Sequence, residues 1–212
     1  MTSIDNKGAG AVVTEIAAVI VDNKAYLSEI DGKIGDGDHG VNMAKGFARA
    51  AERLDPEGTL TDALELLSDV LMSEIGGSMG PLYGMTFSDM AESLGDAEKI
   101  DAANFAAMIR AGLEGVQDIG SAKVGDKTLL DAFVPAVDAF DAAITGGKSF
   151  AEALDAMKAA AAEGRDSTVD MVARVGRSSR LGERSRGVLD AGATSCAMIL
   201  AGFAESIGKR LT

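Results

Sequence analysis

The chain has 212 residues, which is enough for one sizeable core, and we expect a single domain over residues 1–212. Its formal net charge of −13 argues against nucleic acid and an anionic membrane as partners, because both repel an acidic surface. The N-terminus lacks the features of a signal peptide, no apolar run approaches the ~20 residues of a membrane span, and Cys196 is the only cysteine, so we expect a cytoplasmic protein.

Apolar residues recur at helical spacing through nearly the whole chain, and few stretches are rich in the residues that favour strands. We therefore predict eight helices. In chain order they lie near residues 12–30, 40–50, 60–71, 79–94, 105–116, 130–144, 150–157 and 193–207. Short loops between them indicate an all-α fold, an antiparallel up-and-down bundle.

The loops of such a bundle alternate between its two ends. The loops after the first, third, fifth and seventh helices cover residues 35–40, 76–80, 120–128 and 176–192, and each contains glycine and polar residues. Because they should share one rim, we expect these four segments to form one composite site.

The stretch Ile34 to Met43 reads I-G-D-G-D-H-G-V-N-M. Asp36 and Asp38 lie between glycines, Asp31 lies five residues upstream of Asp36, and the only histidine follows Asp38. Three carboxylates this close repel one another unless a cation lies among them. Oxygen ligands without a thiolate favour Mg²⁺ or Ca²⁺ over Zn²⁺, and the spacing is not that of an EF-hand. The stretch predicts a magnesium site that handles phosphate, and an acidic surface turn is the alternative.

Two further turns have the composition of phosphate-binding segments. Gly77 and Ser78 open a helix, so backbone N–H groups and the positive end of the helix dipole are available to an anion, although a simple helix cap is the alternative. In V-G-D-K-T-L-L, Asp126 is a predicted N-cap and Thr128 lies in the first turn. Lys127 is either a solvated side chain or a phosphate ligand. No strand precedes this turn, so a P-loop is not supported.

The segment from residue 165 to residue 186 reverses the sign of the chain's charge. It contains six arginines and only three acidic residues, which gives a net charge of +3. Arginine suits bidentate phosphate contact, so the segment indicates an anion site; salt bridges to the acidic surface are the alternative. The arginines are Arg165, Arg174, Arg177, Arg180, Arg184 and Arg186.

These segments together resemble a known family. I-G-D-G-D-H-G-V-N-M, G-G-S-M-G-P-L-Y-G, G-D-K-T and G-R-S-S-R-L-G-E-R-S-R-G-V-L-D-A-G-A-T-S look like the ADP-binding L subunit of dihydroxyacetone kinases, in family order and over nearly the whole chain. The resemblance implies an eight-helix antiparallel barrel with the nucleotide at one rim. It also implies two Mg²⁺ ions, held by Asp31, Asp36 and Asp38 and bound to the phosphates of ADP or ATP.

The resemblance also implies residues that contact the nucleotide. With Gly77 and Thr128 added from the two turns above, we expect this set to be His39, Gly40, Asn42, Gly77, Ser78, Met79, Gly120, Thr128, Leu129, Arg177, Asp190, Ala191 and Gly192. Lys127 or Arg184 would contact the nucleotide from the rim. Ala191 stands where family members often have proline, a departure at the nucleotide lid.

The function implied is phosphoryl transfer to a short-chain ketose, dihydroxyacetone or a relative such as erythrulose. In the family a separate K subunit holds the ketose through a histidine, and the donor is either exchanging ATP or a phosphocarrier protein. We expect no general base in this chain, and a homodimer stays open. The alternatives are a regulatory nucleotide-sensing module that docks on a partner protein, a dimetal phosphatase and, disfavoured, a fatty-acid kinase.

Overall fold

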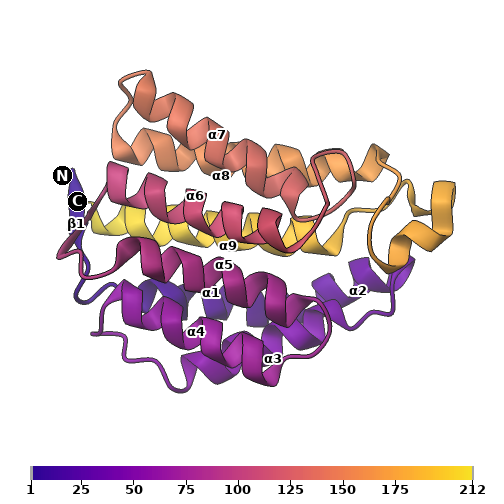
Figure 1. The fold of residues 1–212 in the computed structure, drawn as a ribbon, viewed down its shortest axis with the longest axis horizontal. Helices are drawn as coiled ribbons and strands as arrows, with labels where there is room; N and C mark the ends of the chain where they lie inside the picture. Colours follow the sequence, from indigo (N-terminus) through magenta and orange to yellow (C-terminus); the bar gives the residue numbers. More distant parts are fainter. Residues whose placement is uncertain (1, 212) are drawn as a thin grey trace.

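Helices make up most of the part of the chain that the computed structural model describes, residues 2–211 (Figure 1). The α-helices are α1 (Ala11–Asp22), α2 (Lys24–Ile34), α3 (His39–Ala51), α4 (Leu60–Glu74), α5 (Met79–Leu94), α6 (Ala102–Ile119), α7 (Leu130–Thr145), α8 (Phe150–Ser167) and α9 (Ala191–Arg210). Two 3-10 segments, η1 (Thr168–Asp170) and η2 (Arg177–Ser185), lie between α8 and α9. The predicted all-α class is confirmed.

The first expected helix is divided into α1 and α2. Asn23 lies between them at φ −94° and ψ 11°, and its Nδ2 donates to the Val19 carbonyl at 2.8 Å. An asparagine amide that bonds a nearby carbonyl competes with the helical backbone. The single helix expected over residues 12–30 is therefore wrong, whereas the other seven expected ranges each fall within one observed helix.

Several helices begin where a side chain satisfies their first backbone N–H groups. Ser149 and Glu152 form a capping box at the start of α8, and the Thr59 hydroxyl accepts from the Asp62 N–H at the start of α4. Asp190 does the same for α9, where its Oδ2 accepts from the Ala193 N–H at 2.7 Å. Of these caps, only that of Asp190 lies at a loop of the predicted site, where it fixes the start of α9.

A two-stranded antiparallel sheet was not expected. Strand β1 (Ser3–Asp5) pairs with β2 (Lys99–Asp101), and the partners Ile4 and Ile100 are both buried. Each strand has only three residues, so neither shows a recognisable alternation in the sequence. The sheet joins the N-terminal segment to the start of α6.

The helices pack as a closed sequence of neighbours around one core. Contacts run from α1 to α3, then through α4, α5, α6, α7, α8 and α9, and from α9 back to α1. Phe105, Phe140, Phe150 and Phe203, from four consecutive helices, meet with ring centroids 5.1 to 6.3 Å apart. This packing leaves the two ends of the helices as the places for irregular loops.

Helix α9 lies within this core. By length and composition alone it could cross a membrane, which corrects the expectation that no such stretch exists, but 67% of that window is buried inside the protein. Figure 1 draws β1 and the end of α9 at one end of the long axis, and η2 and the end of α2 at the other. The predicted site segments lie toward the η2 end.

Candidate functional site

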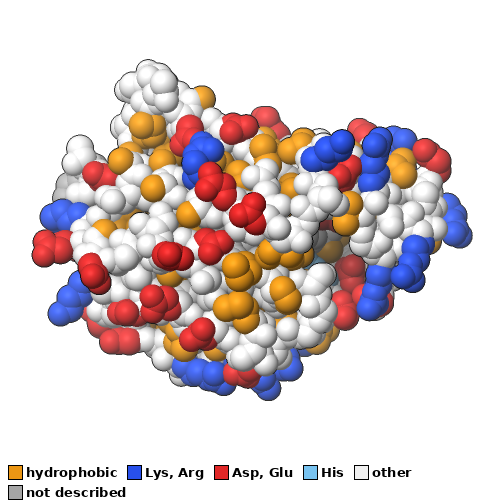
Figure 2. Space-filling model, in the orientation of Figure 1, with side chains coloured by type: hydrophobic (Ala, Val, Ile, Leu, Met, Phe, Trp, Pro, Cys, Tyr) orange, Lys and Arg blue, Asp and Glu red, His pale blue; other side chains and the backbone are white. Residues whose placement is uncertain are grey.

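Two adjoining cavities open at this end of the molecule, with volumes of about 210 and 280 Å³. They share Asp31, His39, Ser78, Met79 and Ser178. Figure 2 shows a hollow in this face with acidic side chains inside it and a lobe rich in Lys and Arg beside it. The first cavity also contains acidic residues of the α2–α3 loop, and the second is lined by more apolar residues.

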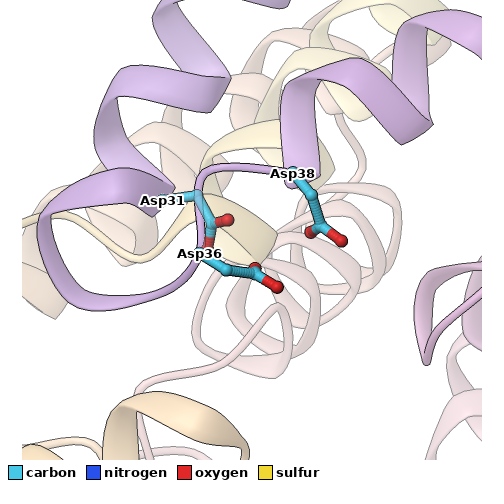
Figure 3. Close-up of side chains that lie close together, drawn as sticks. All are labelled: Asp31, Asp36 and Asp38. Atoms are coloured by element: carbon cyan, nitrogen blue, oxygen red, sulfur yellow. The ribbon is translucent and has the colours of Figure 1, made fainter.

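The first cavity contains the three predicted metal-binding aspartates. One carboxylate oxygen from each of Asp31, Asp36 and Asp38 lies within 4.8 Å of the other two (Figure 3). Asp36 and Asp38 are exposed, and Asp31 is half-buried. Asp38 immediately precedes α3, yet its side chain makes no capping hydrogen bond and stays available to a cation. The donor set consists of hard oxygens, the ligands that Mg²⁺ prefers.

Glycines and one backbone N–H set the position of these carboxylates. A Cβ on Gly35 would collide with the Asp31 carboxylate, and Gly37 adopts φ +76°, which favours glycine. The His39 N–H donates to Asp31 Oδ2 at 3.3 Å. The glycines that flank the aspartates in the sequence therefore allow the tight turn that gathers them.

Arg177 is the first residue of η2, and its side chain reaches the loop of residues 35–38, which carries Asp36 and Asp38 and is called the metal loop below. Its guanidinium forms an ion pair with the Asp36 carboxylate, and the preceding Gly176 adopts φ +73°. Both charged groups remain partly exposed, so other ions can compete for them. This contact joins the basic segment to the acidic loop, and both residues line the first cavity.

The second cavity lies between the start of α5 and the start of α9. Its lining includes Leu82, Tyr83, Leu129 and Val175, together with residues 190–192. Gly77 adopts φ +75°, and Ser78 precedes α5 without using its hydroxyl as a cap. The helix therefore presents its first N–H groups and a free hydroxyl next to the metal loop.

A chain of buried hydrogen bonds connects the two cavities to the core. His39 Nε2 lies 2.9 Å from Ser195 Oγ, which lies 2.6 Å from the Tyr83 hydroxyl. The Tyr83 hydroxyl also donates to the Gly192 carbonyl at 3.2 Å. Burial lowers the pKa of His39 to about 4, with the Asp31 charge opposing that shift, so the imidazole is neutral near pH 7.

The family follows from comparison with known proteins. A family profile described as "DAK2 domain" matches residues 33–205. The chain belongs to the DAK2-domain family. Among its relatives, "PEP-dependent dihydroxyacetone kinase 2, ADP-binding subunit DhaL" of Listeria innocua is 35% identical over 213 residues, which cover 97% of each chain. "PEP-dependent dihydroxyacetone kinase, ADP-binding subunit DhaL" of Escherichia coli is 36% identical over 185 residues, 86% of this chain and 88% of that one.

A solved structure agrees with this assignment. The dihydroxyacetone kinase from C. freundii, in complex with AMP-PNP and Mg²⁺, superposes with a TM-score of 0.71 at 26% identity. The match covers 93% of this chain and 33% of that one. Within the DAK2-domain family, the chain therefore groups with the ADP-binding DhaL subunits of dihydroxyacetone kinases.

The structure brings together most of the residues that the sequence predicted. Four of them, Gly40, Asn42, Gly120 and Arg184, line neither cavity. Gly40 is instead needed for packing, because a Cβ there would collide with the Lys24 carbonyl of α2. The residues that do line a cavity are Asp31, Asp36, Asp38, His39, Gly77, Ser78, Met79, Lys127, Thr128, Leu129, Arg177, Asp190, Ala191 and Gly192.

The turn before α7 differs from its prediction in two residues. Asp126 is not the N-cap of that helix; its Oδ2 accepts from the Lys123 N–H, and Asp131 binds the Thr128 N–H from inside the helix. Lys127 is not a solvated side chain, because it is 1% exposed and its ammonium contacts backbone carbonyls. Cys196, the only cysteine, is buried in the hydrophobic core.

Tyr83 and Ser195 are site residues that sequence reasoning missed. Each lies one helical turn after a predicted residue, Tyr83 four positions after Met79 and Ser195 four positions after Ala191. Residues four apart share a helix face, so that spacing was a usable signal. The Tyr83–Ser195 hydrogen bond spans 112 positions and the His39–Ser195 hydrogen bond spans 156, so neither has a local signature in the sequence.

Asp190 makes a testable contribution to the pH dependence of stability. Burial raises its pKa to about 6, although the Ala193 N–H and the Lys127 charge oppose the shift. Between pH 4 and 6 the folded chain thus binds a proton that the unfolded chain has released, and stability falls as pH rises through this window. This decrease in the free energy of unfolding is about 2 kcal/mol. We expect Asp190→Asn, which can still cap α9, to abolish it.

The measurement is chemical denaturation of both proteins in EDTA at pH 4, 5, 6 and 7. His39 acts in the opposite direction, because its lowered pKa costs stability as pH falls from 6.5 toward 4, but it is common to both proteins. The difference between them should therefore grow with pH in favour of the variant. A constant difference from pH 4 to pH 7 would show that Asp190 is not the group responsible.

Proposed function

We propose that this chain is the nucleotide-binding phosphoryl-transfer subunit of a dihydroxyacetone kinase, a phosphotransferase that acts on a short-chain ketose together with a K subunit. The observation that carries the proposal is the convergence of Asp31, Asp36 and Asp38 in a cavity that Arg177 also lines. The DhaL relatives, named as ADP-binding subunits of such kinases, support it.

The three aspartates would hold Mg²⁺ on the phosphates of ADP or ATP. We infer two ions, because three adjacent carboxylates and a polyphosphate supply enough negative charge and oxygen ligands for more than one. Bound Mg²⁺ would neutralise the charge on the β- and γ-phosphates, which is the main requirement of phosphoryl transfer. The related C. freundii kinase was crystallised with Mg²⁺ and AMP-PNP.

The protein's own residues would orient the nucleotide between the two cavities. The Gly77–Ser78 turn and the first N–H groups of α5 suit the phosphates, and Arg177 would bind them from the opposite side. The more apolar cavity, with Leu129 and residues 190–192, suits the nucleoside. Gly40, Asn42 and Gly120 would contribute only if the loops shift when nucleotide binds.

The remaining expectations extend the same proposal. The closed sequence of helix contacts supports an eight-helix antiparallel barrel in a single domain over residues 1–212, with α1 and α2 acting as one bent helix. The names of the DhaL relatives include "PEP-dependent", which favours a phosphocarrier as donor over free exchange of ATP. We propose a cytoplasmic subunit, with dihydroxyacetone or erythrulose as acceptor and a homodimer as a further form to test.

Calorimetric titration with Mg²⁺ and ADP tests the nucleotide site. Wild-type protein should bind, and Arg177→Ala should bind about 1.5–3 kcal/mol more weakly, because a charge-assisted contact to phosphate is lost. Arg165→Ala is the matched control, since Arg165 pairs with Asp166 and lines neither cavity. Equal losses of nucleotide affinity in both variants would mean that the basic segment acts through its overall positive charge and not through a contact of Arg177.

A further inference from the structure

Lys127 occupies an unusual position for a lysine. It has a positive φ of 63°, the only such value at a non-glycine residue within residues 2–211, and its side chain is among the largest fully buried ones. Burying an ammonium is costly unless hydrogen-bond acceptors surround it. Here the acceptors are all backbone carbonyls, so the group is held by main chain rather than by a carboxylate.

Four carbonyls converge on the Lys127 ammonium. The distances from Nζ are 2.7 Å to Thr168, 3.3 Å to Met171, 2.8 Å to Ser185 and 2.5 Å to Val188. An ammonium has three N–H donors and no acceptor, so these contacts use its full capacity and leave none for a phosphate. The phosphate-ligand interpretation of Lys127 is therefore replaced by a contact with the protein's own backbone.

The four carbonyls belong to the two ends of one segment. We call residues 168–188 the arginine strap; it leaves α8 through η1, carries Arg177 near its middle and returns before α9. The Gly187 N–H also donates to the Val169 carbonyl at 2.7 Å, which holds the two ends together. Lys127 thus binds the base of a loop whose tip reaches Asp36.

Besides the Lys127 contacts, η2 packs against α2 and η1 against α8, but few hydrogen bonds fix the strap to the helical body. The Arg174 N–H donates to the Asp126 carbonyl, and the Asp190 N–H donates to the Thr168 hydroxyl. Most residues of the strap from 174 to 184 are exposed or half-buried, so apolar packing contributes little there. Burial lowers the pKa of Lys127, while the carboxylates of Asp190 and Asp131 oppose that shift and favour the charged form.

We propose that Lys127 is a positioning residue for the nucleotide site. Its ammonium fixes the base of the arginine strap, so that the Arg177 guanidinium lies at the metal loop, ready for the phosphates. Lys127 is among the residues that line the second cavity, but its ammonium is engaged by the four carbonyls, so it acts through Arg177 and not by binding the nucleotide. The part of this inference that concerns nucleotide binding rests on the proposed function, whereas the order of the strap can be measured without any nucleotide.

A double-mutant cycle tests whether Lys127 works through Arg177. Calorimetry with Mg²⁺ and ADP is run on full-length wild type, Lys127→Met, Arg177→Ala and the double variant. Lys127→Met should weaken binding by about tenfold or more, as expected for loss of the charge-assisted contact that it supports. In the Arg177→Ala background the same substitution should weaken binding less than about threefold, because the effects of coupled residues are not additive. Full additivity would overturn the inference.

The matched control is Lys123→Met, which removes an exposed lysine from the same loop. It should bind Mg²⁺ and ADP as wild type does. Each variant must first show the helical circular dichroism of wild type. If Lys127→Met does not, Lys127→Gln, which keeps two N–H donors for the carbonyls, takes its place in the cycle.

Hydrogen exchange without nucleotide gives an independent readout. In Lys127→Met, amides of the arginine strap should exchange at least about tenfold faster, while those of α6 keep their wild-type rates. Equal acceleration in α6 would indicate general destabilisation and would reject the positioning role. If wild type binds no Mg²⁺ and ADP, the proposed function fails, yet the exchange experiment still decides whether Lys127 orders the strap.

Discussion

Asp38→Ala is expected to abolish Mg²⁺-dependent nucleotide binding while leaving the helical fold intact. The Asp38 carboxylate makes no capping bond and lies within 4.8 Å of the other two carboxylates, so its loss removes a metal ligand and little else. Asp36→Ala should have the same effect on binding. Calorimetry with Mg²⁺ and ADP measures it, and unchanged affinity in both variants would remove the metal-site interpretation.

The same substitutions should differ in their effect on stability without metal. Removing one of three adjacent like charges relieves repulsion, so Asp38→Ala should unfold at a higher temperature than wild type in EDTA. Asp36→Ala also loses the ion pair with Arg177 and should gain less. Asp155→Ala is a suitable control, because it removes an exposed carboxylate of α8 that has no part in the site.

The second large effect concerns turnover. The purified chain should bind Mg²⁺ and nucleotide but phosphorylate neither dihydroxyacetone nor erythrulose until its cognate K subunit and a phosphoryl donor are added. Its only histidine, His39, is engaged with Ser195 and lies beside the metal loop, so it is poorly placed to hold a substrate carbonyl. The histidine that holds the ketose must then come from another polypeptide, which places the ketose within about 3–3.5 Å of the transferred phosphate.

This experiment also separates the kinase proposal from the alternatives. Mixtures with the K subunit and Asp38→Ala should stay inactive, which excludes activity carried by the partner alone. A regulatory module would bind nucleotide but never transfer phosphate, and a dimetal phosphatase would hydrolyse simple phosphate esters without a partner. Steady ketose phosphorylation by this chain, shown by mass spectrometry to be free of other proteins, would overturn the split-kinase proposal.

The sequence predicted those features that depend on local pattern. Apolar spacing located seven of the helices, and glycine-flanked aspartates indicated the metal loop before any geometry was known. The expectation that loops alternate between the two ends of the bundle correctly placed segments such as residues 76–80 and 176–192 at one end. Each of these depends on residues a few positions apart, where side-chain type and spacing suffice.

What the sequence could not predict depends on distant partners. The pairing of Ile4 with Ile100 joins segments that are far apart in the chain, and the His39–Ser195 contact spans 156 positions. Lys127 is the clearest case, because polar residues on both sides favoured a solvated side chain or a phosphate ligand. Only the folded chain shows backbone carbonyls of residues 168–188 gathered around its ammonium.

The arrangement of the chain along the long axis has a practical consequence. Strand β1 and the end of α9 lie opposite η2 and the metal loop (Figure 1). A purification tag, a fluorescent protein or a surface anchor joined beyond either element would project from the far end of the molecule. Attachment before β1 or after α9 therefore suits immobilised binding assays, in which the cavity, the arginine strap and any docking partner stay accessible to solution.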